Sequence, residues 1–216
     1  MEFQNETLFE RSELDDELKE DLDEAIAHGI LVSNLAFYLC LELGLSEEYS
    51  YEMAKAGMLH DIGKLRLGRL LYGRKKDTLK IEEMKYVRMH PELGYESLKN
   101  MGGYSEIILK SIYHHHENYD GSGYPDNIKG NRIPYGARIL RTCDVFAALV
   151  SERSYRSAFD IDTAIELMID EVKNFDMEIF LAFMKVVYSE SFTKFRDYVD
   201  EISRLLHILP VDFVHI

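Results

Sequence analysis

Imidazole and carboxylate side chains recur along this 216-residue chain at predicted helix ends or one helical turn from an acid. The residues concerned are Glu24, His28, His60, Asp61, His90, His115, His116 and Asp144. Glu24 and His28 are four positions apart, so on a helix both side chains project from one face. His60 and Asp61 are adjacent, and Gly63 ends the predicted helix directly after them, so both side chains can turn into one cavity.

The order of these donors is more specific than any single pair, since a lone histidine on an apolar face is more often a core residue. His-Asp, then His, then His-His, then Asp fall on successive predicted helices. Imidazole with carboxylate suits iron, manganese or zinc better than calcium, which prefers oxygen ligands. Eight donors exceed the roughly six ligands that one ion takes, so we expect at least two ions. Two metals about 3.5 to 4 Å apart are suited to phosphoester hydrolysis.

Composition narrows the class of protein. A net charge of −14 argues against a nucleic-acid polymer as partner, because such binding requires phosphate neutralisation by Lys and Arg. No uninterrupted apolar run approaches the roughly 18 residues that span a bilayer, and the acidic N-terminus lacks an export signal, so we expect a cytoplasmic protein without a membrane segment. Cys40 and Cys143 are expected to be buried thiols. The basic stretch 64–80 is either a solvated face or a rim that attracts phosphate.

Apolar residues recur at spacings of three and four, and hairpin signals are missing, which predicts an all-α fold. Helices are predicted over about 22–43, 46–60, 79–89, 91–101, 104–118, 135–151, 161–173 and 175–187. Gly44 should end the first helix, Ser46 should cap the second, and Pro91 should open another. The longest irregular stretch, 119–134, is rich in glycine and proline, so the adjacent histidines of "HHHENYDGSGYP" should lie at a helix end.

The chain is expected to form a single domain with extensions at both ends. We predict an acidic helical extension over 1–21, a catalytic helical bundle over 22–187, and a C-terminal helix over 188–216 that packs on the domain. The apolar stripe of that last helix leaves a homodimer contact open.

Four motifs resemble the HD-GYP subgroup of the HD metal-dependent phosphohydrolases, over roughly residues 22–187. They are "MLHDIGK", "RMHPELGYESL", "HHENYDGSGYP" and "IPYGARILRTCDVFAAL". The resemblance implies an HD-domain helical bundle with two or three divalent ions, usually iron or manganese, with zinc, nickel or magnesium also compatible. It implies hydrolysis of the bacterial second messenger cyclic di-GMP to pGpG or GMP by a hydroxide held between the metals. Some relatives prefer cyclic GMP-AMP, and some are degenerate.

The resemblance also implies a role for individual residues. The metal ligands are expected to be His28, His60, Asp61, His90, His115, His116 and Asp144, with Glu24 as the extra ligand of trinuclear members. Asp61 is expected to bridge two ions, and Lys64 to reach the scissile phosphate or the attacking hydroxide. Arg153 and Arg156 correspond to residues that hold substrate phosphates, a task suited to the forked guanidinium. His114 is surplus to the pattern and is expected in a supporting or surface role.

Gly123, Tyr124 and Pro125 form the signature loop of the subgroup. The resemblance implies that this loop shapes the edge of the site, with Tyr124 near the substrate, and contacts diguanylate cyclase partners. The alternative is an ordinary turn with Tyr124 packed on the domain.

Two departures from the family pattern leave other functions open. Ala147 stands where relatives usually have an aspartate, so a hydrogen bond that supports the metal ligands is expected to be missing. The segment after "HDIGK" also differs in length and charge. The alternatives are a cyclic-dinucleotide-binding or cyclase-docking adaptor with little turnover, and an HD phosphohydrolase of another nucleotide.

Overall fold

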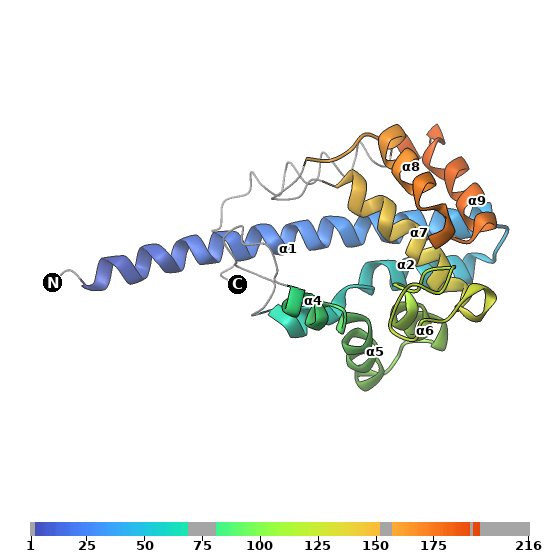
Figure 1. The fold of residues 1–216 in the computed structure, drawn as a ribbon. Helices are drawn as coiled ribbons and strands as arrows, with labels where there is room; N and C mark the ends of the chain where they lie inside the picture. Colours follow the sequence, from blue (N-terminus) through green and yellow to red (C-terminus); the bar gives the residue numbers. More distant parts are fainter. Residues whose placement is uncertain (1–2, 69–80, 152–156, 191, 195–216) are drawn as a thin grey trace.

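The computed structural model describes residues 3–68, 81–151, 157–190 and 192–194, and this part of the chain contains helices and connecting turns with no strand (Figure 1). The α-helices are α1 (Phe3–Glu42), α2 (Glu47–Leu59), α4 (Ile81–Val87), α5 (His90–Met101), α6 (Glu106–His114), α7 (Tyr135–Val150), α8 (Ile161–Asp170) and α9 (Met177–Val187). Short 3-10 turns are η1 (Ile62–Leu67), η2 (Gly130–Arg132) and η3 (Val172–Asn174). The predicted all-α fold is confirmed.

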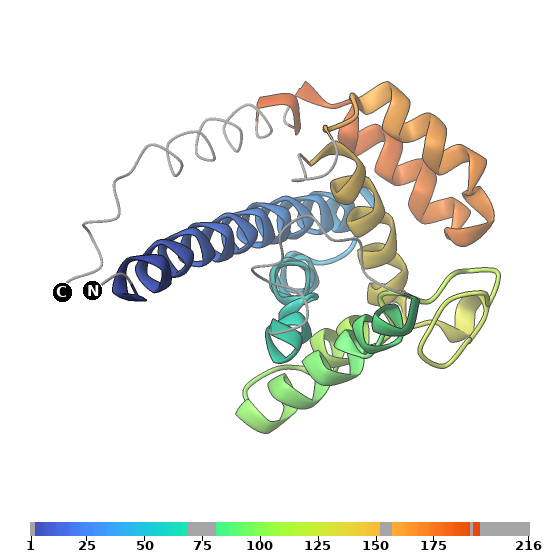
Figure 2. The ribbon, with the colours of Figure 1, turned by 60° about the vertical axis from the view of Figure 1, so that its left-hand side comes forward.

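Helix α1 is the axis of the fold. Figure 1 shows its N-terminal half extending away from the other helices, while its C-terminal half lies between two groups of them. On one side are α2 and the helices α4 to α6, and on the other α7, α8 and α9, an arrangement also visible in Figure 2. Helix α1 contacts α2, α7 and α9. Helix α7 also contacts α6, and this contact joins the two groups. Residues 3–21 of the predicted N-terminal extension belong to the same helix α1.

The C-terminal half of α1 supplies much of the hydrophobic core, which explains its composition. Its fully buried side chains include Val32, Leu35, Ala36, Leu39 and Cys40. The expectation that no segment has the composition of a membrane span is wrong for Asp21–Glu42. That segment, with a mean hydropathy of 1.5, is long and apolar enough to cross a membrane by length and composition, although 44% of it is buried inside the fold.

Capping residues place several helix ends as predicted. The Ser46 side chain accepts a hydrogen bond from the backbone N–H of Tyr49 at 3.2 Å and starts α2, and Pro91 lies in the first turn of α5. Gly44, with φ of +72°, follows the end of α1. Two predicted helix ends are wrong: α8 ends at Asp170 rather than near residue 173, and α6 ends at His114 rather than near residue 118. The backbone N–H of Glu117 donates to the His114 carbonyl in a tight turn instead of continuing the helix.

The two cysteines are free and buried, as expected. Burial raises the pKa of the Cys40 thiol to about 12. The predicted helix over 188–216 lies largely outside the described residues, although Phe192 near its start is buried in the core.

Candidate metal centre

Seven of the eight predicted donors converge in two adjacent groups. Within each group, one nitrogen or oxygen ligand atom of every member lies within 4.8 Å of those of the others. The histidine-rich cluster consists of Asp61, His90, His115 and His116, and the α1–α7 cluster consists of His28, His60 and Asp144. These residues come from α1, the ends of α2 and α6, the start of α5, and α7. Side chains more than a hundred positions apart in the sequence therefore share one site.

Three of the imidazoles are held by the same local hydrogen bond to the backbone. The Nδ1 atoms of His60, His90 and His115 lie 2.7, 2.7 and 2.6 Å from the carbonyl oxygens of the residues three positions earlier, which are Gly57, Val87 and Ile112. A carbonyl oxygen can only accept, so each Nδ1 carries the proton. Each Nε2 atom then presents its lone pair, which is the form that binds a metal.

The Nε2 atoms of the histidine-rich cluster are crowded together. His90 Nε2 lies 3.2 Å from His115 Nε2, 3.1 Å from His116 Nε2 and 3.1 Å from Asp61 Oδ1. Because His90 and His115 hold their protons on Nδ1, their facing Nε2 lone pairs repel unless a cation lies between them. Neighbouring ligands about 2.0 to 2.1 Å from one metal lie about 3 Å from each other, so this spacing fits a bound ion.

The α1–α7 cluster is arranged around the Asp144 carboxylate. Asp144 Oδ1 is 3.0 Å from His28 Nε2 and 3.5 Å from His60 Nε2. His60 Nε2 is also 3.5 Å from Asp61 Oδ2, whose other oxygen faces His90. Asp61 therefore lies between the two clusters, in the position expected of a bridging ligand.

Two buried atoms at this junction have no hydrogen-bond partner among the described residues. They are His60 Nε2 and Asp61 Oδ1. Buried polar atoms are rarely left unsatisfied, because their desolvation costs about 1 to 3 kcal/mol. The orphaned atoms and the crowded Nε2 atoms show that these residues fit divalent metal ions.

Both cluster carboxylates are held in the charged form. Burial alone would raise the pKa of Asp61, but His60 and Lys64 hold it well below its usual value. Burial likewise opposes ionisation of Asp144, and the nearby His28 and His60 side chains hold the pKa of that carboxyl well below its usual range.

Most of the imidazoles with shifted pKa values are held neutral. Burial, with the neighbouring His116 and His90, places the pKa of His115 well below its ordinary value. Burial lowers the pKa of His116 to about 3 and also lowers that of His28. His60 differs: burial would lower its pKa, but the carboxylates of Asp61 and Asp144 raise it.

Lys64 lies beside the bridging position. Its Nζ is 2.5 Å from Asp61 Oδ2, and the side chain is partly exposed on η1. Gly63 lets η1 approach α5 closely, since a Cβ at this position would lie 2.0 Å from the His90 carbonyl oxygen. This close approach brings the His60–Asp61 pair next to His90.

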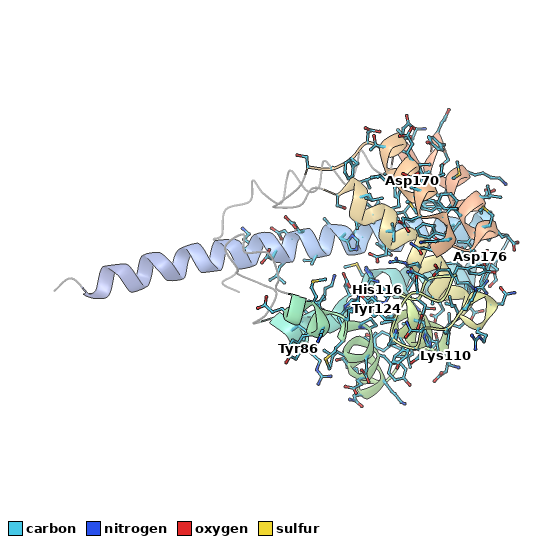
Figure 3. The ribbon with its side chains drawn as sticks, viewed as in Figure 1. Tyr86, Lys110, His116, Tyr124, Asp170 and Asp176 are labelled. Carbon is cyan, nitrogen blue, oxygen red and sulfur yellow. The ribbon has the colours of Figure 1, made fainter. Side chains whose placement is uncertain are left out.

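The signature loop folds back onto the histidine-rich cluster. The Tyr124 ring is stacked on His116 with centroids 4.7 Å apart, and the two side chains lie together in Figure 3. The backbone N–H of Tyr124 donates to the His116 carbonyl at 3.1 Å, and the Tyr124–Pro125 peptide is cis. Gly123 is required here, because a Cβ would lie 2.4 Å from that same carbonyl oxygen. The loop edges the cluster, with Tyr124 partly buried against it.

Some predicted residues are not in the clusters. Glu24 lies one turn before His28 on α1, but its carboxylate is not among the converging ligand atoms. His114 Nδ1 is 3.8 Å from an Asp126 oxygen and belongs to neither cluster, consistent with the supporting role expected for it. Arg153, Arg156 and most of the basic stretch lie outside the described residues. Ala147 is completely buried in the hydrophobic core.

Sequence reasoning missed three residues that border the site. Glu117 is buried and accepts a hydrogen bond from the Asp126 backbone N–H at 2.7 Å, which braces the signature loop. Burial raises the pKa of its carboxyl group. The guanidinium carbon of Arg88 lies 5.3 Å from the centroid of the Tyr124 ring, and Arg141 approaches from α7. The only local signal was position: Glu117 directly follows the histidine pair, and Arg141 precedes Asp144 by one helical turn.

Comparison with protein families assigns the fold and site to a known class. The family model described as HD domain matches residues 6–179, and the chain belongs to this family, whose members are metal-dependent. All the converging donors lie within the match. The resemblance to the HD-GYP subgroup is confirmed by the relatives that the chain matches.

Two curated relatives are cyclic di-GMP phosphodiesterases by name. The chain is 38% identical to the cyclic di-GMP phosphodiesterase response regulator RpfG of Xanthomonas campestris pv. campestris over 135 residues, which are 62% of this chain and 35% of RpfG. It is 33% identical to the cyclic di-GMP phosphodiesterase PA4108 of Pseudomonas aeruginosa over 170 residues, which are 79% of this chain and 41% of PA4108. The chain thus spans less than half the length of either relative.

A solved structure shows the same fold. It is Bd1817, an HDG"Y"P protein from Bdellovibrio bacteriovorus, which aligns with a TM-score of 0.63 at 19% identity. The alignment covers 76% of this chain and 53% of Bd1817.

Proposed function

We propose that this protein is a metal-dependent phosphodiesterase that hydrolyses cyclic di-GMP to pGpG or GMP. The observation that carries the proposal is the convergence of seven imidazole and carboxylate donors around a shared Asp61. The relatives named as cyclic di-GMP phosphodiesterases support the choice of substrate.

Each cluster would hold one divalent ion, iron or manganese by preference. Asp61, His90, His115 and His116 would hold the first ion, and His28, His60 and Asp144 the second, with Asp61 shared. Bound in this way, the ions supply Lewis-acid activation of water and of the phosphoryl oxygens. A third ion with Glu24 as ligand, as trinuclear relatives have, belongs to the same proposal.

The protein's own groups orient the substrate and limit proton movement. Lys64 places an ammonium at Asp61, where it would neutralise charge that grows on the scissile phosphate. The Nδ1–H bonds to backbone carbonyls fix the tautomers of His60, His90 and His115, so these rings hold their protons during the reaction. Tyr124 forms the edge against which a guanine base or ribose would lie, and Arg153 and Arg156 would hold phosphate.

The direct test is product formation by the metal-loaded protein. Protein purified without oxygen and loaded with Fe(II) or Mn(II) should convert cyclic di-GMP to pGpG or GMP, identified by chromatography. Cyclic GMP-AMP, deoxynucleoside triphosphates and mononucleotides belong in the same panel. Turnover of deoxynucleoside triphosphates without turnover of any cyclic dinucleotide would assign the chain to another HD phosphohydrolase activity.

Ala147 favours a second candidate, an adaptor that binds a cyclic dinucleotide with little turnover. Because this side chain is a methyl group in the core, it cannot supply the supporting hydrogen bond that an aspartate would. Tight binding of cyclic di-GMP with no product after prolonged incubation with each metal would select the adaptor.

The same proposal extends to location and to protein partners. We place the protein in the cytoplasm, where its substrate would be made, and the signature loop is the surface offered to a diguanylate cyclase domain. Association of two copies through the C-terminal segment is tested by light scattering of the chain with and without residues 195–216.

A further inference from the structure

One cation beside the metal centre has no role in the scheme above. Arg141 lies on α7, three positions before Asp144, and its Nε donates a hydrogen bond to the side-chain oxygen of Asn118 at 3.0 Å. Asn118 belongs to the loop that leaves the histidine pair. The guanidinium is therefore held between α7 and the signature loop, next to the clusters.

The contrast with Arg138, one turn earlier on α7, is informative. The Arg138 guanidinium forms an ion pair with Asp176 and donates a further hydrogen bond to Asn131 at 3.1 Å. In the described part of the chain, no carboxylate lies within 4.0 Å of the Arg141 guanidinium nitrogens, and its hydrogen-bond partner is a neutral amide. Arg141 is only partly exposed, and a desolvated cation without a nearby anion is costly.

The charge of Arg141 acts on a different part of the site from that of Lys64. Burial raises the pKa of Tyr124, and the positive charge of Arg141 opposes this rise. The charge of Arg141 also helps to lower the pKa of His116. Burial lowers the pKa of Arg141 itself, and the charge of Asp144 opposes this. Lys64, by contrast, contacts Asp61. Two cations from different elements thus flank the centre at separate places.

A cyclic dinucleotide carries two phosphodiester groups, and the metal centre with Lys64 can hold only one of them during hydrolysis. We propose that Arg141, positioned by Asn118, binds the second phosphate of the substrate, the one that is not cleaved. This inference rests on the proposed function, because it takes a cyclic dinucleotide as the ligand. Arg141 supplies the planar, forked donor that suits a phosphate, and its charge is neutralised when the substrate enters.

The test compares ligands that carry one phosphate with a ligand that carries two. Hydrolysis of bis(p-nitrophenyl) phosphate by the Mn(II)-loaded protein reports the metal centre alone. Inorganic phosphate and cyclic di-GMP are then measured as inhibitors of that hydrolysis. The variants are Arg141→Gln, Arg141→Lys and Asn118→Ala, with the exposed Arg132→Gln as the matched control.

Arg141→Gln should weaken inhibition by cyclic di-GMP about 10- to 100-fold, the range for loss of a hydrogen bond between charged groups. Inhibition by inorganic phosphate and hydrolysis of bis(p-nitrophenyl) phosphate should stay within about 2-fold of wild type, since neither ligand reaches beyond the metals. Arg141→Lys should recover part of the affinity, and Asn118→Ala, which keeps the charge, should lose less than Arg141→Gln. Arg132→Gln should match wild type.

Three results would overturn the inference. The first is unchanged inhibition by cyclic di-GMP in Arg141→Gln. The second is an equal loss for all three ligands, and the third is a loss in Asn118→Ala as large as in Arg141→Gln; either of these would give Arg141 a structural role between α7 and the loop. Product analysis on the wild-type protein judges the proposed function separately: if cyclic di-GMP inhibits but is not cleaved, the hydrolase proposal fails while the inhibition constants still decide the role of Arg141.

Discussion

The two clusters of the candidate metal centre differ in how far their polar atoms find partners within the protein. In the α1–α7 cluster, His28 lies within hydrogen-bond distance of Asp144. The carboxylates of Asp61 and Asp144 raise the pKa of His60, which favours the protonated form of that imidazole. In the histidine-rich cluster, three Nε2 atoms face one another at 3.1 to 3.2 Å with Asp61 as the one carboxylate. Without metal, the first cluster satisfies His28 and Asp144 and leaves only His60 Nε2 without a hydrogen-bond partner among the described residues, whereas the second needs a cation to separate its lone pairs.

This difference explains why Asp61 is central. It is the residue whose two oxygens face both clusters, His90 on one side and His60 on the other. It therefore couples a cluster in which His28 and Asp144 already pair to one whose imidazoles need a cation between them. Substitutions at Asp61 should therefore affect both clusters, whereas a substitution at any other ligand should affect only the cluster to which that ligand belongs.

The largest effect is expected from Asp61→Asn, which removes the charge that joins the clusters. Loss of several kcal/mol of transition-state stabilisation should lower kcat for cyclic di-GMP by at least about 1000-fold. The measurement is steady-state product formation by the Mn(II)-loaded variant. Asp170→Asn, at the exposed end of α8 far from His116 in Figure 3, is the control and should keep wild-type activity. Full activity in Asp61→Asn would refute the proposed site.

His28→Ala and His115→Ala should each reduce the metal content of a different cluster. Each variant should lose about one ion per chain and retain the other, because each truncates a ligand of a single cluster, and loss of even a supporting partner costs about 10- to 100-fold in affinity. Elemental analysis after dialysis against a fixed Mn(II) concentration measures this. His114→Ala is the matched control in the same histidine run and should lose none. Loss of all metal from either variant would show one cooperative site instead of two.

The sequence was informative about the donors because their geometry is local. His60, His90 and His115 each lie at a helix end, where the side chain can bond to a carbonyl three residues back, and the adjacent residues His116 and Asp61 enter the same space. Helix ends follow from caps and glycines that can be read from the sequence. The ordered donor set therefore predicted the metal centre.

What the sequence could not supply depends on how distant elements pack. Glu24 shares a helix face with His28, but whether its carboxylate reaches the ions depends on the placement of α1 against α7. Arg141 and Glu117 acquire their positions only when α7 and the signature loop meet the histidine pair. The hydropathy of Asp21–Glu42 similarly reflects burial by α2, α7 and α9, which no property of that segment alone reveals.

The metal-free protein should lose stability as the pH falls below about 6.5, through buried histidines in and beside both clusters. Imidazoles with lowered pKa bind protons more readily in the unfolded chain, so each contributes up to about 1.4 kcal/mol of lost stability per pH unit below the unfolded pKa. Lowered values belong to His28, His114, His115 and His116. His60, with a raised pKa, is protonated in both states there and adds no slope. Urea denaturation in EDTA between pH 7 and 5 measures this, and His116→Ala should reduce the slope.

The smallest effect is expected at Glu117, which supports the histidine-rich side alone. Glu117→Ala breaks the partly buried hydrogen bond from the Asp126 N–H and truncates a buried side chain, so it should cost about 1 to 3 kcal/mol in the free energy of unfolding. Glu117→Gln keeps an oxygen acceptor and removes a charge that burial disfavours, as its raised pKa indicates, so its cost should be below about 1 kcal/mol. Urea denaturation at pH 7 distinguishes the two. Since neither variant touches His28 or Asp144, the ion of the α1–α7 cluster should remain bound in both. If Glu117→Gln proved as costly as Glu117→Ala, the Glu117 carboxylate would have to be ionised and more fully hydrogen-bonded than this structure shows. The comparison between the two clusters would then have to include the signature loop.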